Sequence, residues 1–144
     1  MLKLSEAASL ALHTMVLLAG IPDKQVSARE IASKLDVSEA HLAKVLQRLA
    51  RRGLLNSVRG PKGGFSLARS YLNISLLDVY ESVEGPLANV RCFRTTRVCN
   101  NKECIFGDLL EDVNKQVRNY LAETKLPDLA GIVRSGNGDQ KKDN

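Results

Sequence analysis

The sequence lacks the features of a membrane or secreted protein. It has no tryptophan, and aromatic residues make up only 4% of its 144 residues. The apolar stretch from Leu10 to Ile21 is interrupted by His13 and Thr14 and is too short to span a bilayer. No basic start with a small-residue cleavage site marks a secretion signal. We therefore expect a cytoplasmic protein without a membrane partner, and this length predicts one compact domain with its own core.

Acidic residues are absent from the 38 positions between Glu39 and Asp78. The same window carries seven cations, namely Lys44, Arg48, Arg51, Arg52, Arg59, Lys62 and Arg69. The whole chain carries a net charge of +5, so the residues outside this window have a net charge of −2. A segment of one charge that is also patterned for folding indicates a polyanion-binding surface, with a solvated basic face as the alternative.

The helical pattern around this window predicts a helix-turn-helix. A first helix over residues 4–19 places apolar residues on one face, at Leu4, Ala8, Ala11, Met15 and Leu18. Ser27 opens a short helix to about Leu35, and a tight turn follows. Ser38 then caps a basic helix that Gly53 ends. The buried stripe of this helix is expected at Leu42, Val45, Leu46 and Leu49.

Two short strands after this helix predict the wing of a winged helix. Residues 54–58 and 65–68 have strand character and are joined by a glycine-rich loop. Another helix follows from Ser75 to about Val83. The predicted fold is mainly α: a winged helix-turn-helix domain over residues 1–85, a cysteine-containing loop over 86–104, a dimerisation helix with a short terminal element over 105–131, and a disordered tail over 132–144.

The basic helix and the wing are the expected contacts with double-stranded DNA. Exposed residues near the start of a recognition helix meet base edges, which predicts roles for Ser38, His41 and Lys44. Phosphate contacts are expected from the cations further along the helix, Arg48, Arg51 and Arg52. In the wing we expect Arg59 to enter a minor groove, supported by the neighbouring loop residues Gly60, Pro61 and Lys62.

A seam of apolar residues near the C-terminus predicts a long helix. Phe106, Leu110, Val113, Val117 and Tyr120 repeat at spacings of four, three, four and three. Packing within the chain would produce the same pattern. Since the preceding winged domain is predicted to be complete, we interpret the seam as a homodimer contact.

The three cysteines lie close together in the segment before this helix. A disulfide framework is not expected from Cys92, Cys99 and Cys104, because their number is odd and the expected compartment is reducing. Thiolates bind iron–sulfur clusters and zinc, yet both prefer four ligands and only three sulfurs are present. An iron–sulfur cluster, redox-active thiols without metal, a zinc site and incidental cysteines therefore all remain open at this point.

Several sequence segments resemble the winged-helix regulators of the IscR/NsrR type. The most specific are Ser57-Val58-Arg59-Gly60-Pro61-Lys62-Gly63-Gly64-Phe65, the segment Glu81-Ser82-Val83-Glu84-Gly85, and the cysteine triplet ahead of a long helix. The similarity covers roughly residues 1 to 131. It implies a homodimeric DNA-binding repressor or activator in which the three cysteines hold an iron–sulfur cluster that controls operator affinity.

The chain departs from this family pattern at the fourth ligand. The resemblance places a histidine three residues after the third cysteine, where this chain has Gly107. Other members use a carboxylate from the first helix of the partner subunit, at the position of Ser9. His13 is our predicted substitute, with Glu6 and Asp108 as further candidates. The cluster type, 2Fe–2S or 4Fe–4S, is left open.

The sequence thus predicts a homodimeric transcriptional regulator controlled by a cluster that senses redox state, iron or nitric oxide. The alternative is a cluster-free regulator that senses redox state through its thiols. An enzyme with a cysteine nucleophile is not expected, because neither histidine adjoins the cysteines in sequence.

Overall fold

The N-terminal part of the computed structural model consists of three helices that begin at serine caps. The structure describes residues 4–68, 70–100 and 103–134, so the predicted disordered tail from residue 135 onward lies outside the described residues. The helices are α1 (Glu6–Ala19), α2 (Ala28–Leu35) and α3 (Glu39–Arg51). The hydroxyls of Ser5, Ser27 and Ser38 each accept a hydrogen bond from the backbone N–H three residues later. These caps confirm the predicted helices.

One residue of the first predicted helix is placed differently. Ser5 caps α1, so Leu4 lies before the helix and is 84% exposed. The prediction that Leu4 belongs to the buried face was therefore wrong. The other four predicted positions on that face, Ala8, Ala11, Met15 and Leu18, are buried.

A left-handed residue forms the turn between α2 and α3. Asp36 has a φ of 54° and ends α2, and the Val37 N–H donates to the Ala32 carbonyl at 3.0 Å. Aspartate adopts this conformation more readily than most residues. The predicted stripe of α3 is buried at all four positions, Leu42, Val45, Leu46 and Leu49. The helix-turn-helix is therefore confirmed.

A two-stranded antiparallel hairpin follows α3 and forms the wing. Strand β1 (Leu55–Val58) pairs with β2 (Gly64–Leu67). Two backbone hydrogen bonds between Val26 and Phe65, at 2.9 and 2.7 Å, attach the hairpin to the segment before α2. At Gly64 a Cβ atom would lie 2.6 Å from the Val26 carbonyl oxygen, so only glycine permits this approach. The predicted wing is confirmed and is anchored to the helical part at its base.

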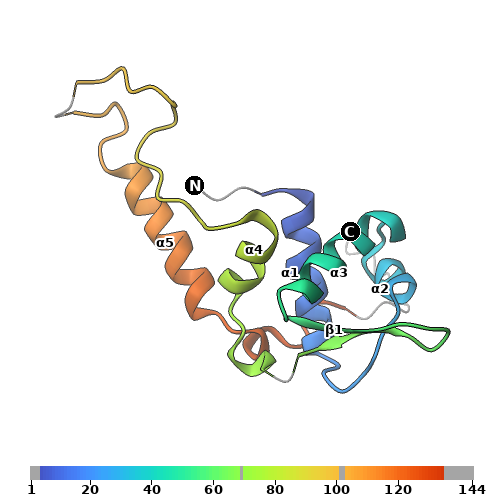
Figure 1. The fold of residues 1–144 in the computed structure, drawn as a ribbon. Coiled ribbons are helices and arrows are strands. Elements are labelled where there is room, and N and C mark those ends of the chain that lie inside the picture. Colours follow the sequence, from blue (N-terminus) through green and yellow to red (C-terminus); the bar gives the residue numbers. More distant parts are fainter. Residues whose placement is uncertain (1–3, 69, 101–102, 135–144) are drawn as a thin grey trace, which may run out of the picture.

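Helix α4 (Leu76–Glu84) returns across the other helices after the short 3-10 helix η1 (Tyr71–Asn73). Ser75 and Asp78 form a reciprocal capping box at its start. Helix α4 packs against α1 and α3, so these three helices and the hairpin share one apolar core (Figure 1).

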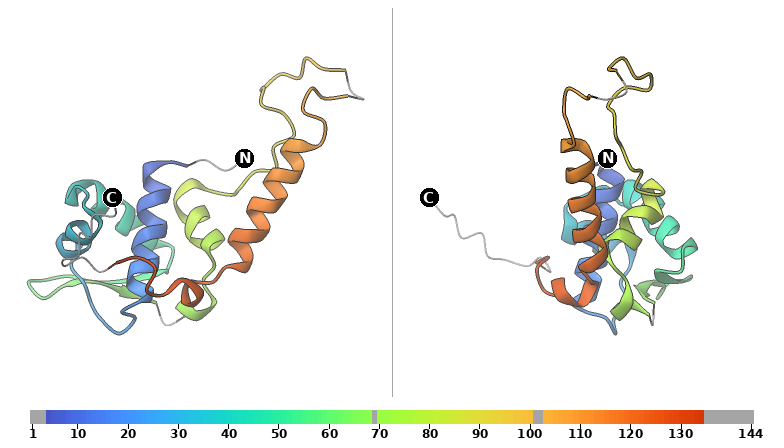
Figure 2. Two further views of the ribbon diagram at one scale, coloured as in Figure 1. Left: turned by 180° about the vertical axis from the view of Figure 1, so that it is seen from behind. Right: turned by 90° about the vertical axis from the view of Figure 1, so that its left-hand side faces the viewer.

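The cysteine segment extends away from the helices, and its described residues form no helix or strand. It leaves the end of α4 and returns into α5 (Leu109–Glu123), as the two views in Figure 2 show. The short 3-10 helix η2 (Leu126–Leu129) follows α5. None of the helices among the described residues is long and apolar enough to cross a membrane.

Helix α5 contributes to the core of its own chain, the alternative that the seam left open beside a homodimer contact. Leu110 and Leu121 are buried, and Val117 packs against the core cluster. Val113 and Tyr120 remain 37% and 61% exposed. The helix therefore has two apolar sides, because residues from the predicted seam are divided between the core and the surface. Phe106 lies before the helix and is 40% exposed.

The segment after α5 completes the winged domain. The Leu76 N–H donates to the Thr124 carbonyl and the Leu126 N–H donates to the Ile74 carbonyl, both at 3.0 Å. The Leu126 side chain is fully buried in the main core. The prediction that the winged domain leaves little core for the C-terminal segment was therefore wrong.

We expect Leu126→Ala to lower the free energy of unfolding by about 2–5 kcal/mol, since it would leave a cavity in the core. The matched control is Leu72→Ala, because Leu72 is 58% exposed and its truncation should change stability by about 0.5 kcal/mol or less. Denaturant unfolding at one protein concentration measures both values. Equal effects of the two substitutions would contradict the placement of Leu126.

Candidate nucleic-acid interface and thiol-lined cavity

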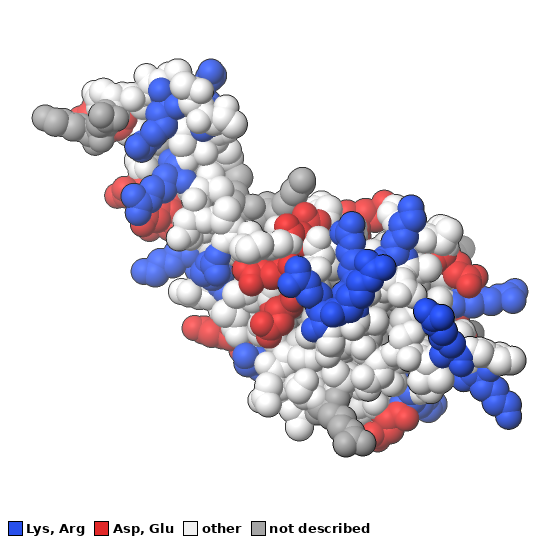
Figure 3. Space-filling view, viewed as in Figure 1, with Lys and Arg blue, Asp and Glu red and all other residues white. Residues whose placement is uncertain are grey.

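The cations predicted to bind DNA gather on one face of the molecule. Figure 3 shows Lys and Arg side chains over α3 and the hairpin, with acidic side chains beside them over α4. The described members of this basic face are all exposed: Lys44, Arg48, Arg51, Arg52, Arg59 and Lys62. Arg69 lies outside the described residues. The fold therefore joins the two halves of the basic sequence window into one surface.

The start of α3 has a neighbour that the sequence did not reveal. The Ser38 hydroxyl accepts the His41 N–H at 3.4 Å, so this side chain caps the helix. The His41 Nδ1 atom lies 3.7 Å from Glu6 Oε1 of α1, and both side chains are largely exposed. A carboxylate of α1 therefore lies beside a residue predicted to contact bases.

Arg48 contacts α4 within the chain. Its Nη1 donates to the Val83 carbonyl at 3.3 Å, near the C-terminal end of α4 where carbonyl groups lack helical partners. Together with Arg51 and Arg52 it lines a hollow of about 290 Å³ at the junction of α3 and α4. The predicted phosphate contact thus also connects the basic helix to α4.

The wing loop is exposed and held at a defined place. Gly60 has a φ of 112°, and its carbonyl accepts the Gly63 N–H at 2.8 Å, which closes the turn. The Gln25 side chain donates to the Lys62 carbonyl at 2.8 Å. Arg59, Pro61 and Lys62 therefore project from a loop that the segment before α2 supports.

All three cysteines line one cavity of about 420 Å³ in the segment between α4 and α5. Cys92, Cys99 and Cys104 are free thiols of intermediate exposure. The charged residues on the same cavity are Arg91, Arg97, Glu103, Asp108 and Glu111. The loop therefore brings together thiols that are six and four residues apart in sequence.

The possible metal donors that line this cavity are thiols and carboxylates. Among the described residues, no group of three or more His, Cys, Asp or Glu side chains lies close enough to hold one metal ion. Three thiols around one cavity nevertheless match the ligand type of iron–sulfur proteins. Gly107, at the position of the family histidine, lines the cavity without a side chain that could ligate.

His13 is not among the described residues that line the cavity of its own chain. It lies exposed on α1, and its Nδ1 atom is 2.7 Å from the Ser9 carbonyl oxygen. The described single chain thus does not bring His13 to the cysteines, and its role as a ligand from a partner subunit stays a prediction.

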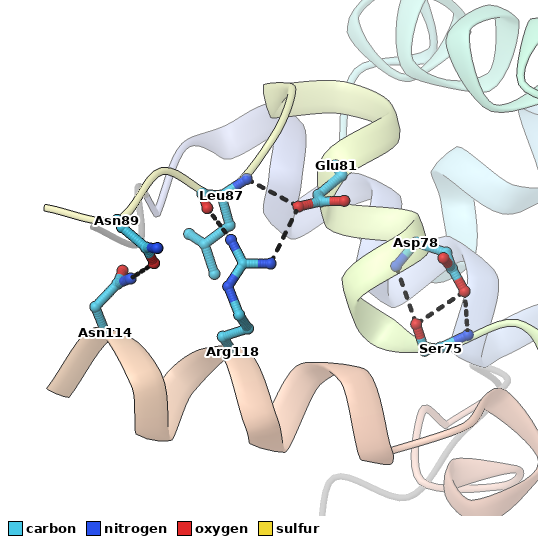
Figure 4. A network of polar contacts seen from close by, with 7 residues as sticks. All are labelled: Ser75, Asp78, Glu81, Leu87, Asn89, Asn114 and Arg118. Atoms are coloured by element: carbon cyan, nitrogen blue, oxygen red, sulfur yellow. Dashed lines mark hydrogen bonds and ion pairs between the residues drawn. The ribbon is translucent and has the colours of Figure 1, made fainter. Parts of the chain in front are cut away.

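A polar network connects the cysteine segment to α4 and α5 (Figure 4). Glu81 of α4 accepts the Leu87 N–H at 2.9 Å, and its Oε1 lies 3.9 Å from Arg118 Nη1 of α5. Arg118 also donates to the Leu87 carbonyl. One turn earlier on α5, the buried Asn114 donates to Asn89 at 3.1 Å. Sequence reasoning missed this network because residues 37 positions apart leave no periodic signal.

Known proteins with related sequences are regulators. The Rrf2 family model, described as "Iron-dependent Transcriptional regulator", matches residues 4–132. An Aquifex aeolicus protein named as an HTH-type transcriptional regulator is 30% identical over 131 residues, which cover 89% of this chain and 91% of that protein. BadM of Rhodopseudomonas palustris, named likewise, is 45% identical over 78 residues. That match spans 54% of this chain and only 50% of BadM.

Solved structures share the fold. CymR, described as the global cysteine regulator of B. subtilis, superposes with a TM-score of 0.78 at 29% identity, covering 93% of this chain and 100% of CymR. The oxidized form of Staphylococcus aureus CymR gives 0.73 at 27% identity, covering 92% and 99%. IscR of T. potens gives 0.70 at 24% identity, covering 96% and 93%, and supports the fold alone. The named relatives are regulators, in agreement with the expectation that the chain is not an enzyme.

We expect Arg59→Ala to weaken affinity for duplex DNA and to reduce the slope of log affinity against log salt concentration by about 1, because one phosphate contact is lost. Lys115→Ala is the control, since it removes a cation from α5, far from the hairpin (Figure 1). Binding isotherms at several salt concentrations provide the measurement. An unchanged slope for Arg59→Ala would exclude the wing from the interface.

Proposed function

This chain belongs to the Rrf2 family of transcriptional regulators, and from that premise we propose that it is a homodimeric DNA-binding regulator whose operator affinity is set by an iron–sulfur cluster. The observation that carries the proposal is the cavity lined by all three cysteines. In this proposal Cys92, Cys99 and Cys104 hold the cluster as thiolates. The cluster would supply a charge and a coordination state that change with redox conditions, iron supply or nitric oxide.

DNA is held by the basic face in this proposal. The exposed start of α3 would present His41 and Lys44 to base edges, since helix-turn-helix proteins place this part of the second helix in the major groove. Arg51 and Arg52, with Arg59 from the wing, would neutralise phosphates. Ser38 would act through the helix that it caps.

A second copy of the chain would cover the exposed apolar side of α5. Leu109, Val113 and Tyr120 are 55%, 37% and 61% exposed and follow one another at spacings of four and seven residues. Such spacing places side chains on one helix face, as in a coiled-coil contact. A twofold dimer through this face would present two α3 helices to half-sites about one helical turn of DNA apart.

The Arg118 network is the proposed route from the cavity to the DNA-binding face. Arg118 contacts Glu81 of α4 and also Leu87, which lies at the beginning of the cysteine segment. The end of α4 in turn accepts the hydrogen bond from Arg48. A change in the shape of the cysteine segment would therefore move α4 and, with it, the orientation of α3. Coupling between two sites requires such an element with two arrangements.

A thiol switch without metal is the second candidate function. It is favoured by free, half-buried thiols that are not gathered around one ion, and by the likeness to CymR, whose S. aureus structure is described as an oxidized form. In this version two thiols give up two electrons and two protons to hydrogen peroxide. The two sulfurs join in a disulfide, and the peroxide is reduced to two molecules of water.

We expect protein purified without oxygen to be coloured and to contain iron and acid-labile sulfide in stoichiometric amounts. Cys99→Ala should lose both, because one thiolate ligand is gone, whereas the loop control Thr96→Ala should keep them. Iron and sulfide analysis with an absorption spectrum measures this. Colourless wild-type protein without iron, which forms a disulfide on peroxide treatment, would instead support the thiol switch.

We expect Arg118→Ala to uncouple the two sites. Allosteric coupling commonly changes affinity by about 5–150-fold, so the ratio of DNA affinities between cluster-loaded and cluster-free wild type should fall in that range. In Arg118→Ala the ratio should approach one, while Lys115→Ala, which removes a cation from the preceding turn, should keep it. If Arg118→Ala keeps the wild-type ratio of DNA affinities, the Arg118 network does not connect the two sites.

A further inference from the structure

The cavity carries a candidate for the ligand that the cysteines do not supply. Clusters of this kind take four protein ligands, and three thiolates leave one position for another donor. Three carboxylates line the same cavity, from Glu103, Asp108 and Glu111. These residues differ in what else their side chains contact.

Asp108 has a fixed place at the start of α5, whereas Glu103 lies in the irregular loop before it. Glu111 Oε2 lies 3.7 Å from Arg91 Nε, so its charge already has a partner. Asp108 holds the N-cap position of α5, where an aspartate ordinarily accepts a first-turn N–H. Its side chain accepts no such hydrogen bond from the described first turn. The carboxylate is therefore available to a ligand in the cavity.

The backbone brings Asp108 next to the third cysteine. The Gly107 N–H donates to the Cys104 carbonyl at 2.9 Å, and Gly107 has a φ of 55°. This closed turn lies between the two residues, so the start of α5 and Cys104 face one cavity. A donor fixed on a helix start is also better positioned than one on a loop.

Resting on the proposed cluster, we infer that Asp108 supplies its fourth ligand, as an oxygen donor from the same subunit. This replaces the sequence-based assignment to His13. A carboxylate is a harder ligand than a thiolate, so the position that it holds exchanges more readily than the sulfur-held positions. It also adds negative charge, which Arg91 and Arg97 on the same cavity offset.

The test compares Asp108→Ala with two matched variants after anaerobic reconstitution. Glu103→Ala removes another carboxylate of the cavity, and His13→Ala removes the histidine of α1. The readouts are iron and sulfide per subunit, the absorption spectrum, and the rate of cluster loss to an iron chelator. We expect Asp108→Ala to lose the cluster about tenfold faster or more, a factor typical of a weakened metal site. The two matched variants should keep the wild-type rate.

Asp108→Cys provides a gain-of-ligand variant. A fourth thiolate should retain the cluster, shift its absorption spectrum and slow its loss to the chelator relative to Asp108→Ala. Circular dichroism and size-exclusion chromatography verify that each variant folds, which the exposed side chain of Asp108 leads us to expect.

The outcomes separate this inference from the proposed function. If the wild-type protein binds a cluster and Asp108→Ala loses it at the wild-type rate, the inference is overturned and the cluster proposal stands. Rapid cluster loss in His13→Ala instead would assign the position to the partner subunit and also overturn it. Wild-type protein that binds no iron or sulfide would overturn both proposals together.

Discussion

Two backbone hydrogen bonds hold the segment after α5 against the segment that precedes α4. They join Leu76 to Thr124 and Ile74 to Leu126, and the side chain of Leu126 enters the core beside them. Because this joint is far in sequence from the helix-turn-helix, it closes a long stretch of chain onto the winged domain. The free energy for that closure comes from apolar burial, since each hydrogen bond contributes only about 1 kcal/mol net. The joint thereby keeps α4 and α5, the two helices that flank the cysteine segment, against one another.

The second anchor of that segment is electrostatic. Arg118 and Glu81 are each about one-third exposed and share Leu87 between them, so the pair is only partly withdrawn from water. A partly exposed ion pair stabilises weakly, which suits the regulatory role that we propose for this contact. The apolar joint lies after the C-terminal end of α5, and the polar network lies closer to its N-terminal end. The polar network is the weaker of the two contacts, and it lies nearer the cysteines.

Charge is distributed differently over the two candidate sites. The basic face carries the cations of α3 and the hairpin beside the acidic side chains of α4, and its clustered positive charge favours a polyanion. The thiol-lined cavity, by contrast, mixes two arginines with three carboxylates among its described residues, so its charges are of both signs. Arg48 links the two regions through α4, because its guanidinium contacts the Val83 carbonyl.

The sequence by itself determined the local elements. Serine caps, apolar stripes and the glycines around the hairpin are short-range signals, and they predicted α1 to α4 and both strands to within about two residues. The basic face followed as well, since its cations lie on adjacent elements. What only the tertiary structure decided is which side of α5 faces the core, and which residues meet across the fold. Contacts such as Glu81 with Arg118 and Glu6 with His41 join distant positions. No periodicity records such contacts, because they depend on how the finished helices pack.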